Sequence, residues 1–346
     1  MSALSALQTA AGAASVACFL VWGTLPAAAE SEVNVYSGRQ EFLIRPLLDN
    51  FTAETGIRVN VVSAKADALL ERLRREGVNS PADVLLTVDA GRLIRAKQAG
   101  VLQGVESAAL RAAIPAQYRD PEGFWYGLSV RARPIMYAKG RVSPAELSTY
   151  EDLANPKWKG RICVRSSSSV YNLSMLAAMI ARLGVAETEA WAKALVANFA
   201  RSPQGGDRDQ IRAVAAGECD LALANTYYLA GLAASPKARD RAAAAGVAIF
   251  WPNQDGRGVH VNVSGAGVTA SARHKENAVR LIEFLASDRA QRTYAEVVQE
   301  YPVTPGIEVS GTVAEWGAFK ADSLPLATLA QYNAEAIRIA DRVDWR

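Results

Sequence analysis

The sequence predicts an α/β protein with two lobes and a ligand cleft between them. Strand and helix signals alternate along the chain, which is typical of α/β folds. The alternation is interrupted by consecutive extended segments and then starts again. With 346 residues, 50% of them hydrophobic, the chain is long enough to bury two cores. Because ligands of open α/β sheets bind at the carboxyl ends of strands, such a cleft would enclose a small solute.

The first 29 residues indicate a secretory signal peptide. The segment 10–25 is almost wholly apolar or small, Pro26 ends it, and three alanines before Glu30 offer a cleavage site. No lysine or arginine precedes Arg39, so a retained transmembrane anchor is the alternative. The short apolar core and the alanines favour cleavage and export to the periplasm.

The first series of elements alternates regularly after the signal. Strands are expected at 33–36, 58–62 and 83–88, and helices at 41–54, 66–76 and 91–98. Leu69, Leu70 and Leu73 lie on one face of the second helix, and Gly56 and Gly100 follow the first and third as stop signals. This order suits a mostly parallel sheet.

The pattern then changes to extended segments at 124–130 and 134–137 with no helix between them, followed by a turn-rich stretch at 147–160. A second series follows, with strands at 161–165, 220–224 and 247–251 and helices at 170–183, 188–199, 210–216 and 226–234. The Gly- and Val-rich segment 256–267 resembles a return crossing, and 276–300 is strongly helical. We therefore expect an N-terminal lobe of 30–128 and 254–309 and a C-terminal lobe of 129–253 and 310–346.

Cys163 and Cys219 each begin an apolar, strand-like run. An oxidising compartment permits a disulfide between them. Two separate buried cysteines are the commoner outcome for such positions and are the expectation here, with a disulfide left open.

Composition argues against several functions. The net charge is +3 with no long run of like charge, so nucleic acid is not an expected partner. Two histidines and three cysteines leave little material for a zinc or thiol enzyme. The sequence lacks G-x-S-x-G, a phosphate-binding loop and H-E-x-x-H. His260 and His274 are expected to be structural or exposed, and an enzyme is not predicted.

The most informative residues are tyrosines. Tyr227 and Tyr228 follow the predicted strand 220–224, and Tyr171 follows the strand 161–165 and four serines. Both places are carboxyl ends of strands that lead into helices, where ligands bind. Spacing alone favours a plainer interpretation, one buried tyrosine and one at the surface. Phenolate oxygen is a hard donor suited to Fe³⁺, but a free tyrosine has a pKa of about 10, so the metal must displace its proton.

Seven short blocks along the chain carry a resemblance to a known family. They are Val35-Tyr36-Ser37-Gly38-Arg39, Phe51-Thr52-Ala53-Glu54-Thr55-Gly56-Ile57, Asn79-Ser80-Pro81-Ala82-Asp83-Val84-Leu85-Leu86-Thr87-Val88-Asp89, Arg131-Ala132-Arg133, Pro156-Lys157-Trp158-Lys159-Gly160-Arg161, Ala224-Asn225-Thr226-Tyr227-Tyr228 and Pro252-Asn253-Gln254. Together they resemble the bacterial and cyanobacterial periplasmic ferric-iron-binding proteins of the FbpA/FutA type.

The resemblance implies a two-lobed, type II-like periplasmic binding protein fold with ferric iron in the cleft. It implies that Tyr171, Tyr227 and Tyr228 are phenolate ligands and that Arg131 is a cation near the site. It further implies delivery of iron to the permease and ATPase of an ABC transporter in the inner membrane. A monomer is expected.

One part of the sequence departs from this family. Members carry His-Tyr, or a histidine ligand, where this chain has Gln40 and Glu41. Asp67 stands where some members place a ligating glutamate, so it is a candidate carboxylate ligand. The N-terminal lobe therefore lacks its usual aromatic or imidazole donor.

The sequence also differs from this family in a charged residue near the tyrosine pair. An arginine that some members carry soon after the tyrosine pair is Gly231 here. Carbonate, another small anion or water is expected to complete the iron coordination, with Arg39 or Arg131 pairing with the anion.

The sequence is also compatible with two alternatives to ferric-iron binding. An exported binding protein for an organic cation, such as a polyamine, or for an oxyanion gains support from the missing His-Tyr pair. A hydrolase or lyase using the same cleft lacks a nucleophile motif.

Overall fold

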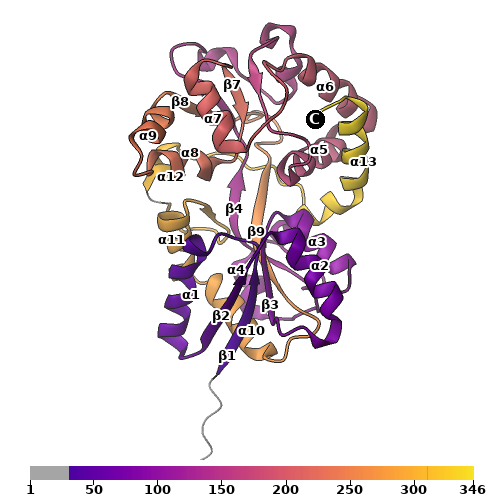
Figure 1. Cartoon of the computed structure of the whole chain (residues 1–346), viewed down its shortest axis with the longest axis vertical. Helices are drawn as coiled ribbons and strands as arrows, with labels where there is room; N and C mark the ends of the chain where they lie inside the picture. Colours follow the sequence, from indigo (N-terminus) through magenta and orange to yellow (C-terminus); the bar gives the residue numbers. More distant parts are fainter. Residues whose placement is uncertain (1–30, 310) are drawn as a thin grey trace, which may run out of the picture.

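The computed structural model describes residues 31–309 and 311–346. The expected signal peptide lies outside these described residues. Two lobes follow one another along the longest axis of the molecule, each built around its own sheet (Figure 1). Within the described ranges no helix has the length and apolar character needed to cross a membrane.

The strands form two separate sheets, in the orders β10-β4-β9-β3-β1-β2 and β6-β7-β5-β8. Their bounds are β1 (Glu32–Ser37), β2 (Arg58–Ser63), β3 (Val84–Val88), β4 (Tyr126–Ala132), β5 (Ile135–Ala138), β6 (Ile162–Cys163), β7 (Leu221–Leu223), β8 (Val247–Phe250), β9 (Val261–Val268) and β10 (Tyr301–Pro302). The mixed α/β class and the two-lobed architecture predicted from the sequence are confirmed.

Helices cover both sheets. They are α1 (Glu41–Thr55), α2 (Ala66–Glu76), α3 (Ala90–Gln98), α4 (Ala108–Ala113), α5 (Val170–Leu183), α6 (Val185–Ala197), α7 (Asp207–Ala216), α8 (Thr226–Ala233), α9 (Ala238–Ala245), α10 (Lys275–Leu285), α11 (Asp288–Thr293), α12 (Gly311–Glu315) and α13 (Leu329–Arg342). In the first lobe β1 pairs in parallel with β2 and β3, as the alternating series predicts, and β9 and β4 continue the sheet antiparallel. In the second lobe β6 and β7 are parallel neighbours, so the segments after them begin at the same edge of the sheet.

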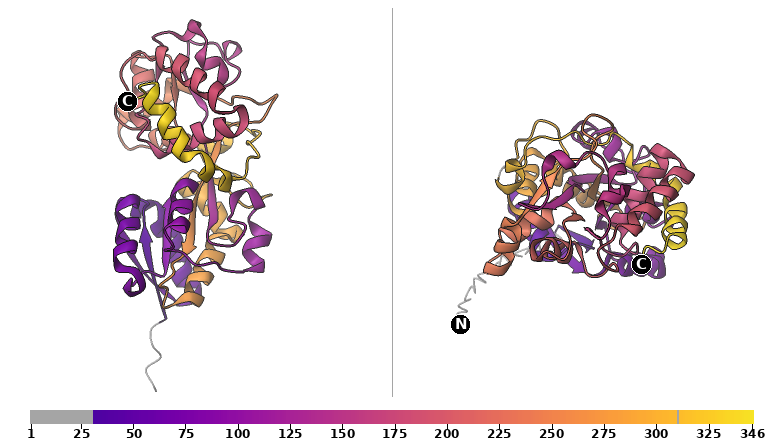
Figure 2. Two further views of the ribbon diagram at one scale, coloured as in Figure 1. Left: turned by 90° about the vertical axis from the view of Figure 1, so that its right-hand side faces the viewer. Right: turned by 90° about the horizontal axis from the view of Figure 1, so that it is seen from above.

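Two chain segments cross between the lobes side by side. Strand β4 leads into β5 through Arg133, and β8 leads into β9 through a segment that includes His260 (Figures 1 and 2). The N–H of Arg133 donates to the His260 carbonyl at 3.0 Å. The buried hydroxyl of Tyr150 donates to the Arg133 carbonyl at 2.6 Å and accepts from the His260 N–H at 3.1 Å. Tyr150 therefore holds the two crossings in register.

His260 makes the stability of this crossing depend on pH. Burial lowers the pKa of its imidazole to about 3, whereas the unfolded chain titrates near the ordinary 6.5. Between these two pKa values the imidazole binds a proton in the unfolded state but not in the folded state. The free energy of unfolding therefore decreases as the pH falls from 6.5 toward 3. We expect His260→Asn to flatten this dependence by about 1.4 kcal/mol per pH unit in urea unfolding between pH 4 and 6. An unchanged slope would contradict the assignment.

The predicted helix 276–300 is wrong as a single element. The structure divides it into α10, α11 and a π-helical segment, Tyr294–Val298. Ser287 begins α11 as its N-cap, accepting a hydrogen bond from the Ala290 N–H, and Gln299 ends the segment in a left-handed conformation at φ 59°. The predicted strand 161–165 is also shorter, because only β6 remains of it.

Cys163 and Cys219 form a disulfide, with their Cα atoms 5.8 Å apart. The expectation of two separate buried cysteines is therefore wrong. The sequence places the two residues in different strand-like runs, and only the parallel pairing of β6 with β7 brings them together: Cys163 lies opposite Ala222, and Cys219 lies two residues before β7.

The disulfide closes a loop with a sequence separation of 56 residues. Because a cross-link restricts the unfolded chain, we expect the double substitution Cys163→Ala with Cys219→Ala to lower the free energy of unfolding by roughly 2–4 kcal/mol. Urea unfolding of oxidised and reduced wild type beside the double variant measures this effect. Reductant should destabilise the wild type and leave the variant unchanged; equal stability of all three would refute the prediction.

Candidate metal centre

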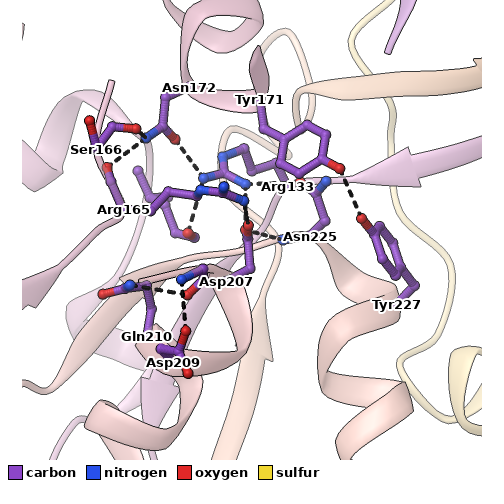
Figure 3. A network of polar contacts seen from close by, with 12 residues as sticks. Arg133, Arg165, Ser166, Tyr171, Asn172, Asp207, Asp209, Gln210, Asn225 and Tyr227 are labelled. Carbon is purple, nitrogen blue, oxygen red and sulfur yellow. Dashed lines mark hydrogen bonds and ion pairs between the residues drawn. The ribbon is translucent and has the colours of Figure 1, made fainter. Parts of the chain in front are cut away.

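The three predicted tyrosines meet at the edge of the second lobe's sheet. Tyr171 is the second residue of α5, and Tyr227 and Tyr228 are the second and third residues of α8. The hydroxyl oxygens of Tyr171 and Tyr227 are 3.3 Å apart (Figure 3). The rings of Tyr227 and Tyr228 lie 4.2 Å apart between centroids. All three are half-buried, so the plainer interpretation of one buried and one surface tyrosine is wrong.

The phenols of the pair are neutral without a metal. Burial raises the pKa of Tyr227 well above its ordinary value, and the neighbouring Tyr171 and Tyr228 raise it further. Burial likewise raises the pKa of Tyr228, again with a contribution from Tyr171. A cation that takes these oxygens as phenolates must displace their protons, so its affinity falls on acidification.

A cavity of about 160 Å³ lies between the tyrosines and the first lobe. Its walls include the three tyrosines, Gln40 from the segment after β1, and Glu300. Residues of both lobes line it, so a bound solute would touch both.

Buried Glu300 and Arg39 form an ion pair on the first-lobe side of the cavity. The two guanidinium nitrogens of Arg39 donate to the two carboxylate oxygens at 3.0 and 3.1 Å, and Ser129 and Ser264 also donate to Glu300. Burial opposes ionisation of Glu300, but Arg39 and Arg131 outweigh it and keep the pKa of the carboxyl below its usual value. The charge of Arg39, predicted to pair with an anion, is thus already balanced.

Arg131 is a buried cation beside the tyrosines, with 1% of its surface exposed. One nitrogen donates to the Val263 carbonyl at 3.0 Å, while Nε and Nη1 have no hydrogen-bond partner among the described residues. Its guanidinium lies 5.3 Å from the ring centroid of Tyr171. Burial opposes the charge, but the adjacent Tyr171 and Tyr227 raise the pKa of Arg131 above its ordinary value. Arg131 is placed to stabilise phenolates.

A buried network fixes the starts of the two tyrosine-bearing helices (Figure 3). Arg133 donates to Asn172 of α5 at 2.6 Å and to Asn225, the N-cap of α8, at 2.9 Å. Asp207 accepts from Arg133 at 2.8 Å and from Arg165 at 2.7 Å. The network thereby sets the distance between Tyr171, which directly precedes Asn172, and Tyr227, which lies two residues after Asn225.

The other candidate residues are placed less centrally. Gln40 is exposed at the cavity wall. Glu41 is exposed and forms an ion pair with Arg45 one turn along α1. Asp67 is exposed and pairs with Arg92 at 3.2 Å and also with Arg95, and it is not among the residues that line the tyrosine cavity.

The described residues contain no group of three or more histidine, cysteine, aspartate and glutamate side chains arranged to hold a metal ion. Phenol oxygens are instead the donors that converge. They are hard oxygen ligands, which suit a highly charged cation better than a soft one.

Sequence analysis missed several residues of the site: Arg133, Arg165, Asp207, Arg208 and Glu300. Asp207 and Arg133 are 74 positions apart, and Arg39 and Glu300 are 261 positions apart. No local pattern links such pairs. The only sequence signal was the block Arg131-Ala132-Arg133, of which we singled out only Arg131.

Two lobes with a polar cavity between them are typical of solute-binding proteins. The profile of the family described as bacterial extracellular solute-binding proteins matches residues 79–320, and this chain belongs to that family. This family membership confirms the prediction of a binding protein rather than an enzyme. Solute-binding proteins of this family work with ABC transporters.

Similar proteins and solved structures agree with this assignment. The chain is 50% identical to "Iron uptake protein A1" of Synechocystis over 317 residues, which cover 92% of this chain and 88% of the relative. The structure of the Trichodesmium protein IdiA (FutA) in complex with iron and citrate ligands matches with a TM-score of 0.89 and 50% identity, covering 91% of this chain and 100% of that one. A ferric binding protein from Campylobacter jejuni matches with a TM-score of 0.86 and 39% identity, covering 91% and 100%. The resemblance to the FbpA/FutA type is confirmed.

Proposed function

We propose that this chain is a periplasmic carrier that binds ferric iron between its lobes and delivers it to an ABC transporter permease with its ATPase. Tyr171, Tyr227 and Tyr228 bind the metal as phenolates. The observation that carries the proposal is the meeting of three phenol groups in an interlobe cavity, beside the buried cation Arg131. The printed names of the relatives, an iron uptake protein and ferric binding proteins, support the same cargo.

The charges fit this cargo. Three phenolates balance the charge of Fe³⁺, and the arginines stabilise those phenolates as they form on metal binding. The remaining coordination positions fall to Gln40, Glu41 or Asp67 of the first lobe, to carbonate or another anion, or to water. Glu41 and Asp67 would first have to leave their arginine partners.

Export and the division into lobes belong to the same function. A signal peptide of residues 1–29 is removed on export. The N-terminal lobe comprises 30–128 and 254–309, and the C-terminal lobe comprises 129–253 and 310–346. Lobe closure around iron presents both lobes to the permease.

A thermal-shift screen tests the cargo. Ferric iron supplied as a soluble chelate should raise the melting temperature of the metal-free protein, because a ligand bound only by the folded state stabilises it. Polyamines should give no shift, since the carboxylate in the cavity wall, Glu300, is already paired with Arg39, and Arg208 adds a further positive charge. A shift with sulfate or phosphate and none with iron would replace the proposal with an oxyanion carrier.

A further inference from the structure

A hydrogen bond between buried side chains joins Asp89 of the first lobe to Ser174 of the second. Asp89 follows β3 of the first sheet and is the N-cap of α3, whereas Ser174 is the fifth residue of α5, which follows β6 of the second sheet. The Ser174 hydroxyl donates to Oδ1 of Asp89 at 2.7 Å. Asp89 has no exposed surface and Ser174 is 4% exposed, so little water competes for this interlobe bond.

The first-lobe partner of this bond is held rigidly in an unusual conformation. Asp89 has a φ of 76°, which residues other than glycine rarely adopt and which costs about 1–3 kcal/mol. Its Oδ1 atom accepts from the Gly91 N–H at 2.9 Å, and its own N–H donates to the Val263 carbonyl at 2.9 Å. The Ala90 N–H donates to Asn262 at 2.8 Å. Since Asn262 and Val263 belong to β9, the strand that follows an interlobe crossing, the carboxyl is fixed beside that crossing.

The second-lobe partner lies on a helix of the tyrosine site. Ser174 comes three residues after Tyr171, so the two side chains share a face of α5. The starts of α3 and α5 also pack together: a Cβ on Gly91 would lie 3.1 Å from Oδ1 of Asp89 and 3.7 Å from Oγ of Ser174. Figure 1 shows α3 at the end of the first lobe that faces α5. The interlobe bond therefore attaches the first lobe to the helix that carries Tyr171.

The other oxygen of Asp89 has an alternative partner close by. Oδ2 of Asp89 is buried and has no hydrogen-bond partner among the described residues, and the same is true of Nε and Nη1 of Arg131. Burial raises the pKa of the Asp89 carboxyl, and Arg131 is the strongest influence that opposes this rise. If the bond to Ser174 breaks, Arg131 can therefore take over the carboxyl.

We propose that the Asp89–Ser174 bond holds the two lobes in the arrangement seen here and slows the release of iron. Neither residue lines the tyrosine cavity, so both act as positioning residues rather than as ligands. Opening of the cavity breaks the bond, and Asp89 then contacts Arg131 instead. The effect on iron rests on the proposed function, whereas the effect on the lobes exists without metal.

Ser174→Ala tests this inference, because it removes the hydroxyl and leaves the three phenols in place. Small-angle X-ray scattering of the metal-free variant should give a larger radius of gyration than that of the wild type. Transfer of iron from the loaded variant to excess chelator should be roughly 2- to 10-fold faster, the value of one hydrogen bond. The colour of the saturated variant should equal that of the wild type.

Ser80→Ala is the matched control. The buried Ser80 hydroxyl also donates to a carboxylate at 2.7 Å, but its partner Glu76 belongs to the same lobe. This variant should match the wild type in scattering and in the rate of iron transfer. An equal change in Ser80→Ala and Ser174→Ala would show a general loss of packing and overturn the inference.

Two substitutions of Asp89 test the bond from the first lobe. Asp89→Asn keeps an acceptor oxygen, and asparagine tolerates a positive φ, so its metal-free scattering should match that of the wild type. Asp89→Ala removes the acceptor and should increase the radius of gyration.

Unchanged scattering in both Ser174→Ala and Asp89→Ala overturns the interlobe bond, and unchanged iron transfer in Ser174→Ala overturns its role in release. Both results leave the iron carrier standing. Failure of the wild type to bind iron overturns the proposed function, while the scattering of the metal-free variants still decides whether the bond holds the lobes.

Discussion

Replacing Tyr227 with phenylalanine is expected to lower the affinity for ferric iron by more than about 100-fold and to weaken the visible colour of the loaded protein. The substitution keeps the ring that packs on Tyr228 and removes only the hydroxyl that lies 3.3 Å from that of Tyr171. Loss of a residue outside the coordination sphere typically costs 10- to 100-fold in metal affinity, so loss of a direct ligand should exceed this range.

Competition against a soluble chelator measures the affinity, and the absorbance of the loaded protein follows the phenolate-to-iron charge transfer. Tyr332→Phe is the matched control, because it removes a half-buried phenol on α13, outside the cavity. Full colour and affinity in Tyr227→Phe would remove this tyrosine from the ligand set.

Asp207→Ala is expected to destabilise the protein by about 3–5 kcal/mol. Asp207 is 1% exposed and pairs with Arg133, which is equally buried, at 2.8 Å. Removing one partner of a buried ion pair leaves the other charge uncompensated, which costs far more than the pair itself contributes. Arg133 would lose its carboxylate while still holding Asn172 and Asn225, so the helix starts that position the tyrosines would loosen as well.

Urea unfolding of the metal-free protein gives this difference directly. Asp255→Ala serves as the control, since this aspartate is exposed and should change stability by no more than about 0.5 kcal/mol. A loss below 1 kcal/mol for Asp207→Ala would show that the network does not hold the site. The variant should also bind iron more weakly than its stability alone explains, because Tyr171 and Tyr227 would no longer be held at a fixed distance.

Local elements were predictable from the sequence because their signals are local. The helix 66–76 was predicted at the bounds of α2, and 170–183 at those of α5. The tyrosine positions were also predictable, since a carboxyl end of a strand depends only on the order of elements. The convergence of Tyr171 with Tyr227 needed one further fact, the parallel pairing of β6 with β7.

The features of the fold and the site that the sequence did not predict depend on contacts between distant parts of the chain. The disulfide, the Arg39–Glu300 pair and the Asp207 network each join residues far apart in sequence. No periodic pattern in the sequence indicates which distant residue each of these charges or thiols contacts. The prediction of one helix over 276–300 was wrong for a different reason. Ser287 caps the start of α11, and this cap outweighs the helical pattern around it. A capping energy of about 1 kcal/mol is enough for this.

The central claim is that phenolates of this chain bind ferric iron, and resonance Raman spectroscopy of the loaded protein tests it most directly. Titration of the metal-free protein should end at one ferric ion per chain, and excitation within the visible band should enhance ring vibrations of iron-bound tyrosinate. The same vibrations should weaken in Tyr227→Phe. Tight iron binding with no tyrosinate vibrations would place the metal on other donors and contradict the account.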